Sequence, residues 1–303
     1  MMTLNSKTCS SLTRFAWLSI GAAVLTIALK TVAYLLTGSI GLLSDALESL
    51  VNLVGAVMAL TMLTVAARPA DADHAYGHSK AEYFSSGTEG MLILVAAVSI
   101  MVAAVPRLIT PRPLEQIGVG LAVSIGASLI NLAVALILRQ AGTRHHSITL
   151  EANSNHLMTD VWTSVGVVVG VGAVSITGWQ RLDPIVAMLV AANIIWVAMS
   201  VLRKSVSGLM DVALSTEDLR LIHGALEPHK EGGVKFHAFL TRQSGARKFV
   251  SFHVIVPGQW TVQRGHLLLE RIEIDIRGVL SNVTVFTHLE SLDDPASWDD
   301  TDL

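Results

Sequence analysis

The sequence predicts a mainly α-helical membrane protein, with six transmembrane helices followed by a small C-terminal α/β domain. The composition, the distribution of charge and the hydrophobic periodicity carry this prediction. Of the 303 residues, 51% are hydrophobic and 15% are charged, and the mean hydropathy is +0.56. Soluble proteins carry about 25% charged residues. Charged side chains are sparse up to about Leu202 and common after it, so the membrane part precedes the soluble part.

Six apolar stretches are long enough to cross a bilayer, which takes about 20 residues in a helix. They cover approximately residues 14–36, 41–65, 85–105, 115–138, 149–177 and 183–203. No small-residue cleavage site follows the first stretch, so we interpret it as a retained helix. The predicted segments are a cytoplasmic tail over 1–13, a membrane domain over 14–208, a cytoplasmic metal-binding dimerisation domain over 209–292 and a disordered acidic tail over 293–303.

Basic residues in the short loops set the orientation, because cytoplasmic loops are enriched in Lys and Arg. Three of them fall on one side of the membrane: Arg107, Arg112 and Arg181. Eight fall on the other side: Lys7, Arg14, Arg68, Lys80, Arg139, Arg144, Arg203 and Lys204. Both termini are therefore predicted to be cytoplasmic.

The pattern after Leu209 changes to that of a soluble α/β domain. Ser215-Thr-Glu-Asp218 resembles a capping box and marks a helix start. Period-2 alternation predicts strands, and an apolar face at helical spacing predicts a second helix. The expected order is helix 215–229, strand 234–241, strand 249–256, helix 262–279 and strand 282–289.

Two pairs of polar side chains interrupt the apolar stretches: Glu48 with Asn52, and His156 with Asp160. Residues four apart lie on one face of a helix, so two such helices facing each other bring four ligands to one point. Four is the coordination number that Zn²⁺ prefers, and ionisable groups in a membrane are functional by default. Asp45 is an alternative ligand, a proton acceptor or a group that supports a ligand. The pattern predicts a divalent-metal transporter; a purely structural polar network is the alternative.

A second cluster lies in the loop after the second apolar stretch. Asp71, His74 and His78 follow one another closely enough to hold a metal ion at the cytoplasmic mouth. The alternative is a solvated loop in which these residues only form turns.

A third cluster lies in the C-terminal domain. His237 and His253 stand on the first two expected strands, and His288 and Glu290 share one face of the third. With His266 on the second helix, these side chains predict a cytoplasmic metal site; ordinary solvated positions are the alternative.

Other features narrow the function classes. A single cysteine, Cys9, excludes an intrachain disulfide and a thiolate-rich metal site. A formal net charge of -3 gives no indication of nucleic-acid binding. A membrane metalloenzyme is a competing class, but the sequence has no His-Glu-x-x-His pattern. A second competing class is a metal sensor or assembly scaffold that transports metal only weakly.

Taken together, these residues resemble the cation diffusion facilitator family, and within it the bacterial Zn²⁺/H⁺ antiporter branch that exports zinc or ferrous iron. Matching stretches run along almost the whole chain: Thr37-Gly-Ser39, Pro69-Ala-Asp71, His74, Gly77-His78, Lys80-Ala-Glu82, His156-x-x-x-Asp160, Gly208-Leu-Met-Asp211, Thr241-Arg-Gln-Ser-Gly245 and His288.

The resemblance implies a Y-shaped homodimer in the bacterial inner membrane, with ferredoxin-like (metallochaperone-like) cytoplasmic domains that pair. It implies alternating access, with metal leaving the cytoplasm as protons enter. By this resemblance, the first cluster corresponds to the family's transport site, the second to its metal site at the cytoplasmic mouth, and the third to its cytoplasmic metal site. The resemblance also assigns Lys80 and Asp211 an ion pair that links the two domains.

The sequence departs from the antiporter pattern at the transport site. Glu48 and Asn52 stand where that branch has two aspartates, and Glu290 stands where aspartate is usual. Asparagine offers a neutral oxygen and does not titrate in this range. Zn²⁺ is the first expectation for the ion, with Fe²⁺, Co²⁺ and Mn²⁺ as alternatives and protons as the counter-ion.

Overall fold

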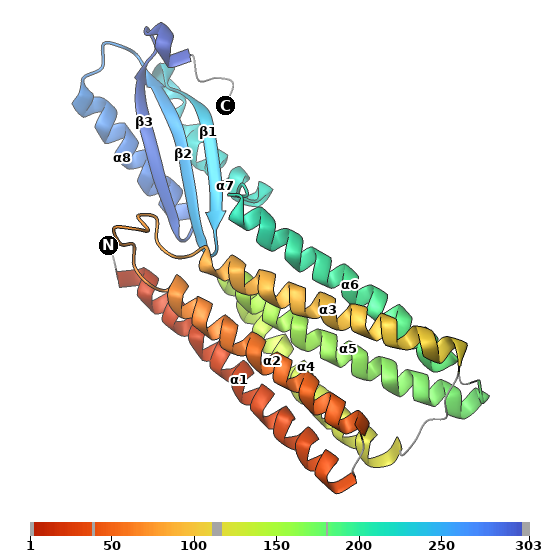
Figure 1. Cartoon of the computed structure of the whole chain (residues 1–303). Coiled ribbons are helices and arrows are strands. Elements are labelled where there is room, and N and C mark those ends of the chain that lie inside the picture. Colours follow the sequence, from red (N-terminus) through yellow and green to blue (C-terminus); the bar gives the residue numbers. More distant parts are fainter. Residues whose placement is uncertain (1–2, 38–39, 111–116, 180, 299–303) are drawn as a thin grey trace. The chain divides into compact units, whose positions relative to one another are not determined.

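The chain folds into six long helices followed by a small mixed α/β unit (Figure 1). The computed structural model describes residues 3–37, 40–110, 117–179 and 181–298. Residues 1–206 and 207–303 form two compact units. The predicted fold class, a mainly α-helical membrane part with a small C-terminal α/β domain, is confirmed.

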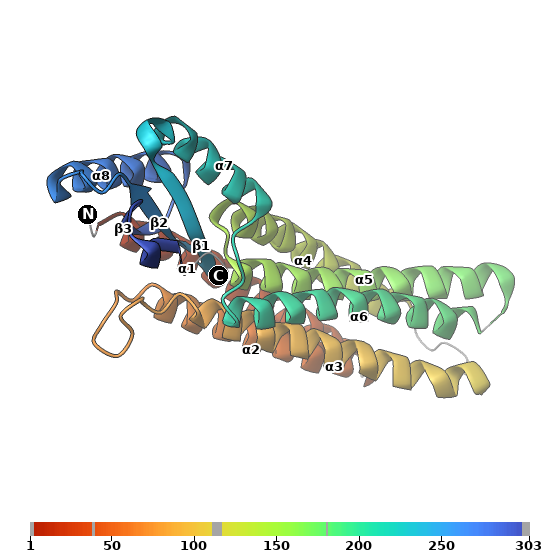
Figure 2. The ribbon, with the colours of Figure 1, turned by 90° about the horizontal axis from the view of Figure 1, so that it is seen from above.

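The first unit consists of helices that run alongside one another in both views (Figures 1 and 2). Their bounds are α1 Thr3–Thr37, α2 Ile40–Ala66, α3 Ala81–Ile109, α4 Ile117–His145, α5 Ile148–Thr177 and α6 Leu182–Leu209. Among the described residues, four stretches are long and apolar enough to cross a membrane: Leu12–Val32, Ala81–Ile109, Ile125–His145 and Pro184–Leu209.

Two hydrophobic clusters organise these helices. The larger one joins α1, α2, α4 and α5 through side chains such as Leu12, Leu63, Leu138 and Leu150. The smaller one joins α3 to α6, with Ile93 and three further side chains. Large apolar side chains also point outward: Leu189 is 68% and Trp196 is 77% exposed. In a bilayer this outward surface contacts lipid, which makes its exposure favourable.

The corner between α4 and α5 aligns the helix that carries His156. Gly142 approaches the start of α5 so closely that an added Cβ would lie 2.9 Å from Cγ and 3.0 Å from the backbone nitrogen of Glu151. The backbone carbonyl of Gly142 also accepts a hydrogen bond from Ser147 N at 3.0 Å. The absence of a side chain at this position therefore sets the separation of the two helices.

We expect Gly142→Ala to lower the free energy of unfolding by about 1–3 kcal/mol, because overpacking against a backbone atom forces the helices apart. The melting temperature in detergent measures this. Gly126→Ala on the same helix is the matched control, since no heavy atom lies within 4 Å of its added Cβ. Equal melting temperatures for the two variants would contradict the expectation.

The second unit has the element order α-β-β-α-β, which is a ferredoxin-like unit without its first strand. Its elements are α7 Thr216–Leu226, β1 Lys235–Ser244, β2 Arg247–Val256, α8 Val262–Val279 and β3 Val283–Ser291. The sheet order is β1-β2-β3, with β1 antiparallel and β3 parallel to β2. Ser215 caps α7 as the sequence predicted, accepting a hydrogen bond from Asp218 N at 3.1 Å.

The core of this unit lies between the sheet and the two helices. Phe252 and Val254 of β2 pack with Ile222 of α7 and with Ile272 of α8. Side chains alternate along a strand, so His253, between Phe252 and Val254, points to the opposite face of the sheet. The helices cover one face, and the histidines of the strands lie on the other.

Two local features differ from the simple periodic pattern. The register of β1 shifts between His237 and Leu240, and Ala238 has a φ of 51°. Such a bulge re-aims the neighbouring side chains. In addition, Pro295–Trp298, within the stretch expected to be disordered, forms a short 3-10 helix. The Trp298 ring lies 6.2 Å from that of His237.

Candidate metal sites

The first candidate site lies around His156 and Asp160 of α5. The His156 side chain is buried, with an exposed fraction of 7%, and its Nδ1 lies 3.6 Å from where a Cβ on Gly55 of α2 would stand. Oδ2 of Asp160 accepts a hydrogen bond from Nδ2 of Asn131 at 3.2 Å. The imidazole therefore faces α2, and the carboxylate is held from α4.

The other three residues predicted at this site are Asp45, Glu48 and Asn52, and the structure describes their backbone but not their side chains. Their backbone belongs to α2, so the four-residue spacing of Glu48 and Asn52 does fall on a helix. The convergence of four ligands stays a prediction.

Three buried polar groups of the helical unit were not singled out as site residues by the sequence prediction. Glu82 and Glu89 of α3 are 2% and 0% exposed, and Asn131 of α4 is 3% exposed. Glu82 accepts a hydrogen bond from the Ser147 hydroxyl. Glu89 is the one acidic residue in the apolar stretch 85–105, so the rule that singled out Asp160, an ionisable group inside a membrane helix, also applied to it.

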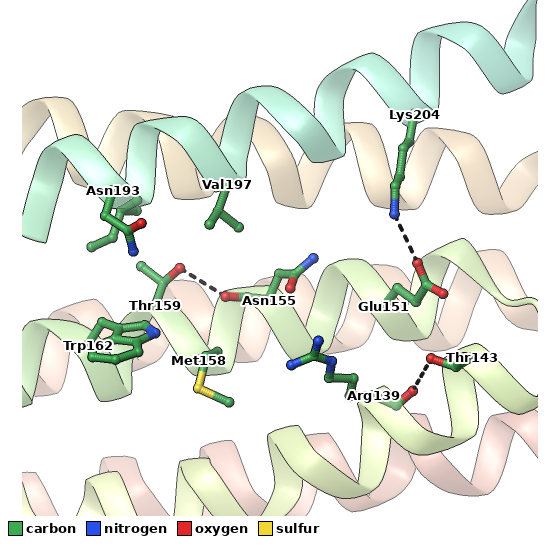
Figure 3. A pocket seen from close by; sticks show the side chains of 11 residues that line it. Arg139, Thr143, Glu151, Asn155, Met158, Thr159, Trp162, Asn193, Val197 and Lys204 are labelled. Carbon is green, nitrogen blue, oxygen red and sulfur yellow. Dashed lines mark hydrogen bonds and ion pairs between the residues drawn. The ribbon is translucent and has the colours of Figure 1, made fainter.

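A pocket of about 450 Å³ lies beside the next face of α5, among residues of α4, α5 and α6 (Figure 3). Its polar lining includes Asn155 and Thr159, which directly precede His156 and Asp160 in sequence. At one end Lys204 Nζ lies 3.5 Å from Glu151 Oε2. The pocket therefore gives polar surroundings to the helix that carries two of the predicted ligands.

The second candidate site is formed by Asp71, His74 and His78, whose potential ligand atoms lie within 4.8 Å of one another. Oδ1 of Asp71 accepts hydrogen bonds from the backbone nitrogens of Asp73 at 3.1 Å and His74 at 2.7 Å. Oδ2 lies 3.3 Å from Nε2 of His78. The loop itself therefore brings these three predicted side chains together.

The hydrogen bond from the His74 backbone lowers the pKa of the Asp71 carboxyl below its ordinary value. The hydrogen bond to the charged Asp71 carboxylate stabilises the folded protein fully above the ordinary pKa of the carboxyl. This stabilisation is lost only as the pH falls through the lowered pKa of the folded state. The Asp71 carboxylate therefore stays charged at any pH at which an imidazole binds metal.

We expect Asp71→Asn to weaken Zn²⁺ binding at this loop by about tenfold at neutral pH, because a neutral oxygen replaces a charged one. The wild-type affinity should itself fall with decreasing pH, since metal and protons compete for the imidazoles. Calorimetric titration of full-length protein with Glu290 replaced by alanine measures both. The exposed Asp73→Asn is the control, and equal affinities for the two variants would contradict the expectation.

The third candidate site is the cluster of His237, His253 and Glu290, whose potential ligand atoms also lie within 4.8 Å of one another. Nε2 of His237 lies 2.7 Å from Glu290 Oε2. Nδ1 of His253 lies 3.0 Å and Nε2 of His288 lies 3.8 Å from Glu290 Oε1. One carboxylate therefore faces three imidazoles.

Strand pairing produces this arrangement. His237 is paired with His253 across β1 and β2, and His253 with His288 across β2 and β3, so one imidazole comes from each strand at the same level. Imidazole nitrogens and a carboxylate are ligands that Zn²⁺ accepts. Nδ1 of His237 is buried without a hydrogen-bond partner in the described part of the chain. These residues fit a divalent ion.

His266 does not join this cluster within the chain. It is exposed on α8, which packs on the opposite face of the sheet from His253, so the fold separates it from the strand histidines. Asp211 accepts a hydrogen bond from Arg242 Nη1 at 3.1 Å within its own unit. The ion pair of Asp211 with Lys80 stays a prediction.

Comparison with known families assigns both halves of the chain. Residues 16–210 match the model of the cation efflux transmembrane domain. Residues 214–292 match the model of the cytoplasmic domain of cation efflux proteins. The boundary between the matches falls close to the division between the two compact units.

Individual relatives extend over nearly the same length. An uncharacterized transporter of Synechocystis sp. is 54% identical over 288 residues, covering 95% of this chain and 93% of the relative. The cation-efflux pump FieF of Shewanella oneidensis is 27% identical over 270 residues, covering 89% and 90%. That of Serratia proteamaculans is 29% identical over 246 residues, covering 81% of each.

Proposed function

The chain belongs to the cation efflux (cation diffusion facilitator) family of membrane transporters for divalent metal ions, and we propose that it is a Zn²⁺/H⁺ antiporter that exports metal from the cytoplasm. It is a transporter rather than an enzyme. The observation that carries the proposal is the buried imidazole of His156 beside a carboxylate, Asp160, that a neighbouring helix orients. A histidine and a carboxylate inside a membrane helix bundle typically mark a pathway for ions or protons.

In this mechanism the ion binds Glu48, Asn52, His156 and Asp160 while the site is open to the cytoplasm. The two carboxylates neutralise the divalent charge, which makes the low-dielectric site tolerable for the ion. A rocking motion of the helices exposes the site to the other side. There, protons compete with the metal for His156 and the carboxylates and displace it.

The membrane domain of the proposal spans 14–208 and the cytoplasmic domain 209–292, with both termini in the cytoplasm of a bacterial cell and the first unit in its inner membrane. Two chains form a homodimer, and Lys80 and Asp211 link the domains. Metal at His237, His253, His288 and Glu290 tightens the dimer when cytoplasmic metal rises. The cluster Asp71, His74 and His78 collects ions at the mouth.

Zn²⁺ is the proposed ion because one imidazole with oxygen ligands suits it. The neutral oxygen of Asn52 makes Fe²⁺, Co²⁺ and Mn²⁺ the competing ions, since carboxylate and carbonyl ligands suit harder cations.

Purified protein in proteoliposomes tests the proposal. With an outwardly or inwardly directed proton gradient, we expect Zn²⁺ flux whose direction reverses with the gradient, and parallel assays with Fe²⁺, Co²⁺ and Mn²⁺ rank the ions. Zn²⁺ flux whose rate and direction do not depend on the proton gradient would contradict antiport. Metal binding without flux of any of these ions would instead favour a sensor or scaffold.

A further inference from the structure

Glu89 is a buried carboxyl group whose surroundings a bound cation would explain. Its side chain is 0% exposed, and within the described part of the chain neither Oε1 nor Oε2 has a hydrogen-bond partner. Burying a carboxylate without compensation is strongly unfavourable, so buried charges are paired or bind metal. Glu82, two turns earlier on α3, is equally buried but is hydrogen-bonded by Ser147.

The position of Glu89 relates it to the predicted transport site. Cγ of Glu89 and Nδ1 of His156 lie 3.9 Å and 3.6 Å, respectively, from the point that a Cβ on Gly55 would occupy. Helices α2, α3 and α5 therefore meet at this point, and Gly55 adds no side chain between the carboxylate-bearing residue and the imidazole. An ion bound to His156 from this direction has Glu89 beside it.

The sequence of α2 relates Asn52 to the same point. Asn52 lies three residues before Gly55, and residues three apart share a face of a helix. The helical spacing therefore predicts that Asn52, the neutral member of the predicted ligand set, shares the helix face that Gly55 presents to Glu89.

We propose that Glu89 is a cation-binding carboxylate of the transport site, which supplies from α3 the negative charge that Asn52 lacks on α2. The inference rests on the proposed function, because it places Glu89 at the site of transport. It adds a third carboxylate to Glu48 and Asp160. The cation that Glu89 would bind is a divalent metal ion.

Calorimetric titration of Zn²⁺ into full-length protein in detergent tests this inference. The parent protein carries Asp71→Ala and Glu290→Ala, so that binding at the other two clusters is weakened. Glu89→Gln is expected to raise the Kd at least tenfold, and Glu89→Asp, which keeps the charge, is expected to raise it less. Glu82→Gln, the same substitution at a buried position on the same helix, is expected to leave the Kd within about threefold of the parent.

A compensating variant separates a charge at the site from a structural role. If Glu89 supplies the charge that Asn52 lacks, Asn52→Asp combined with Glu89→Gln should recover most of the lost affinity. A double variant that folds but binds as weakly as Glu89→Gln alone would overturn the inference. So would a Glu89→Gln variant with unchanged Kd in a parent that binds and transports Zn²⁺. A parent that neither binds nor transports divalent ions would remove the proposed function itself.

Discussion

Replacing Asp160 by alanine is expected to reduce the proposed proton-coupled metal transport by at least about 100-fold, because it removes a charged ligand from a predicted site that already has one carboxylate fewer than the antiporter pattern. The amide of Asn131 donates a hydrogen bond to the Asp160 carboxylate at 3.2 Å, so this carboxylate is held in one orientation from α4. Initial rates of Zn²⁺ uptake into proteoliposomes measure the effect.

Two further variants make this prediction specific. Asn131→Ala should cost about 10–100-fold, since it loosens the orientation of the ligand without removing it. Asp73→Ala, an exposed carboxylate in the loop before α3, should leave the rate unchanged. Transport that survives Asp160→Ala at the wild-type rate would refute the transport mechanism.

The second large effect is expected from Glu290→Ala in the cytoplasmic unit. The Glu290 carboxylate lies 2.7 Å from His237 Nε2 and 3.0 Å from His253 Nδ1. Without it, three imidazoles remain with no negative charge among them, and the Zn²⁺ affinity of the cluster should fall at least tenfold. Bound metal stabilises the folded state in proportion to the logarithm of its affinity, so each tenfold loss removes about 1.4 kcal/mol.

The measurement is the rise in the melting temperature of the full-length protein on addition of Zn²⁺, with Asp71→Ala as the common background. Glu270→Ala, an exposed carboxylate on α8, is the control and should keep the wild-type rise. If Glu290→Ala kept it as well, the cluster would not be a zinc site.

Elements whose formation depends on local sequence could be predicted closely. The expected helix 262–279 is α8 itself, and the expected strand 249–256 is β2 apart from two residues at its start. Both follow from the periodic placement of apolar side chains, which a single segment contains in full. The bulge after His237 could not be predicted, since a register shift depends on the partner strand.

The candidate sites also differ in how far their geometry depends on local sequence. Asp71, His74 and His78 are close in sequence, and the cluster forms through hydrogen bonds within one short loop. Glu290 could be assigned to the strand histidines because period-2 spacing puts it on their face. The position of His266 relative to the strand histidines could not be predicted, because it depends on which face of the sheet α8 covers.

The sequence by itself determined that this chain has a helical membrane part and a small C-terminal α/β domain, and it predicted the i, i+4 pairs of candidate ligands, because hydropathy, charge distribution and these pairs are properties of single segments. Only the tertiary structure decided which buried groups lie close together. Glu89 and His156 are 67 positions apart in the sequence, and they approach one point because Gly55 leaves room where three helices pack. Such proximity arises from packing between helices, which no single segment encodes.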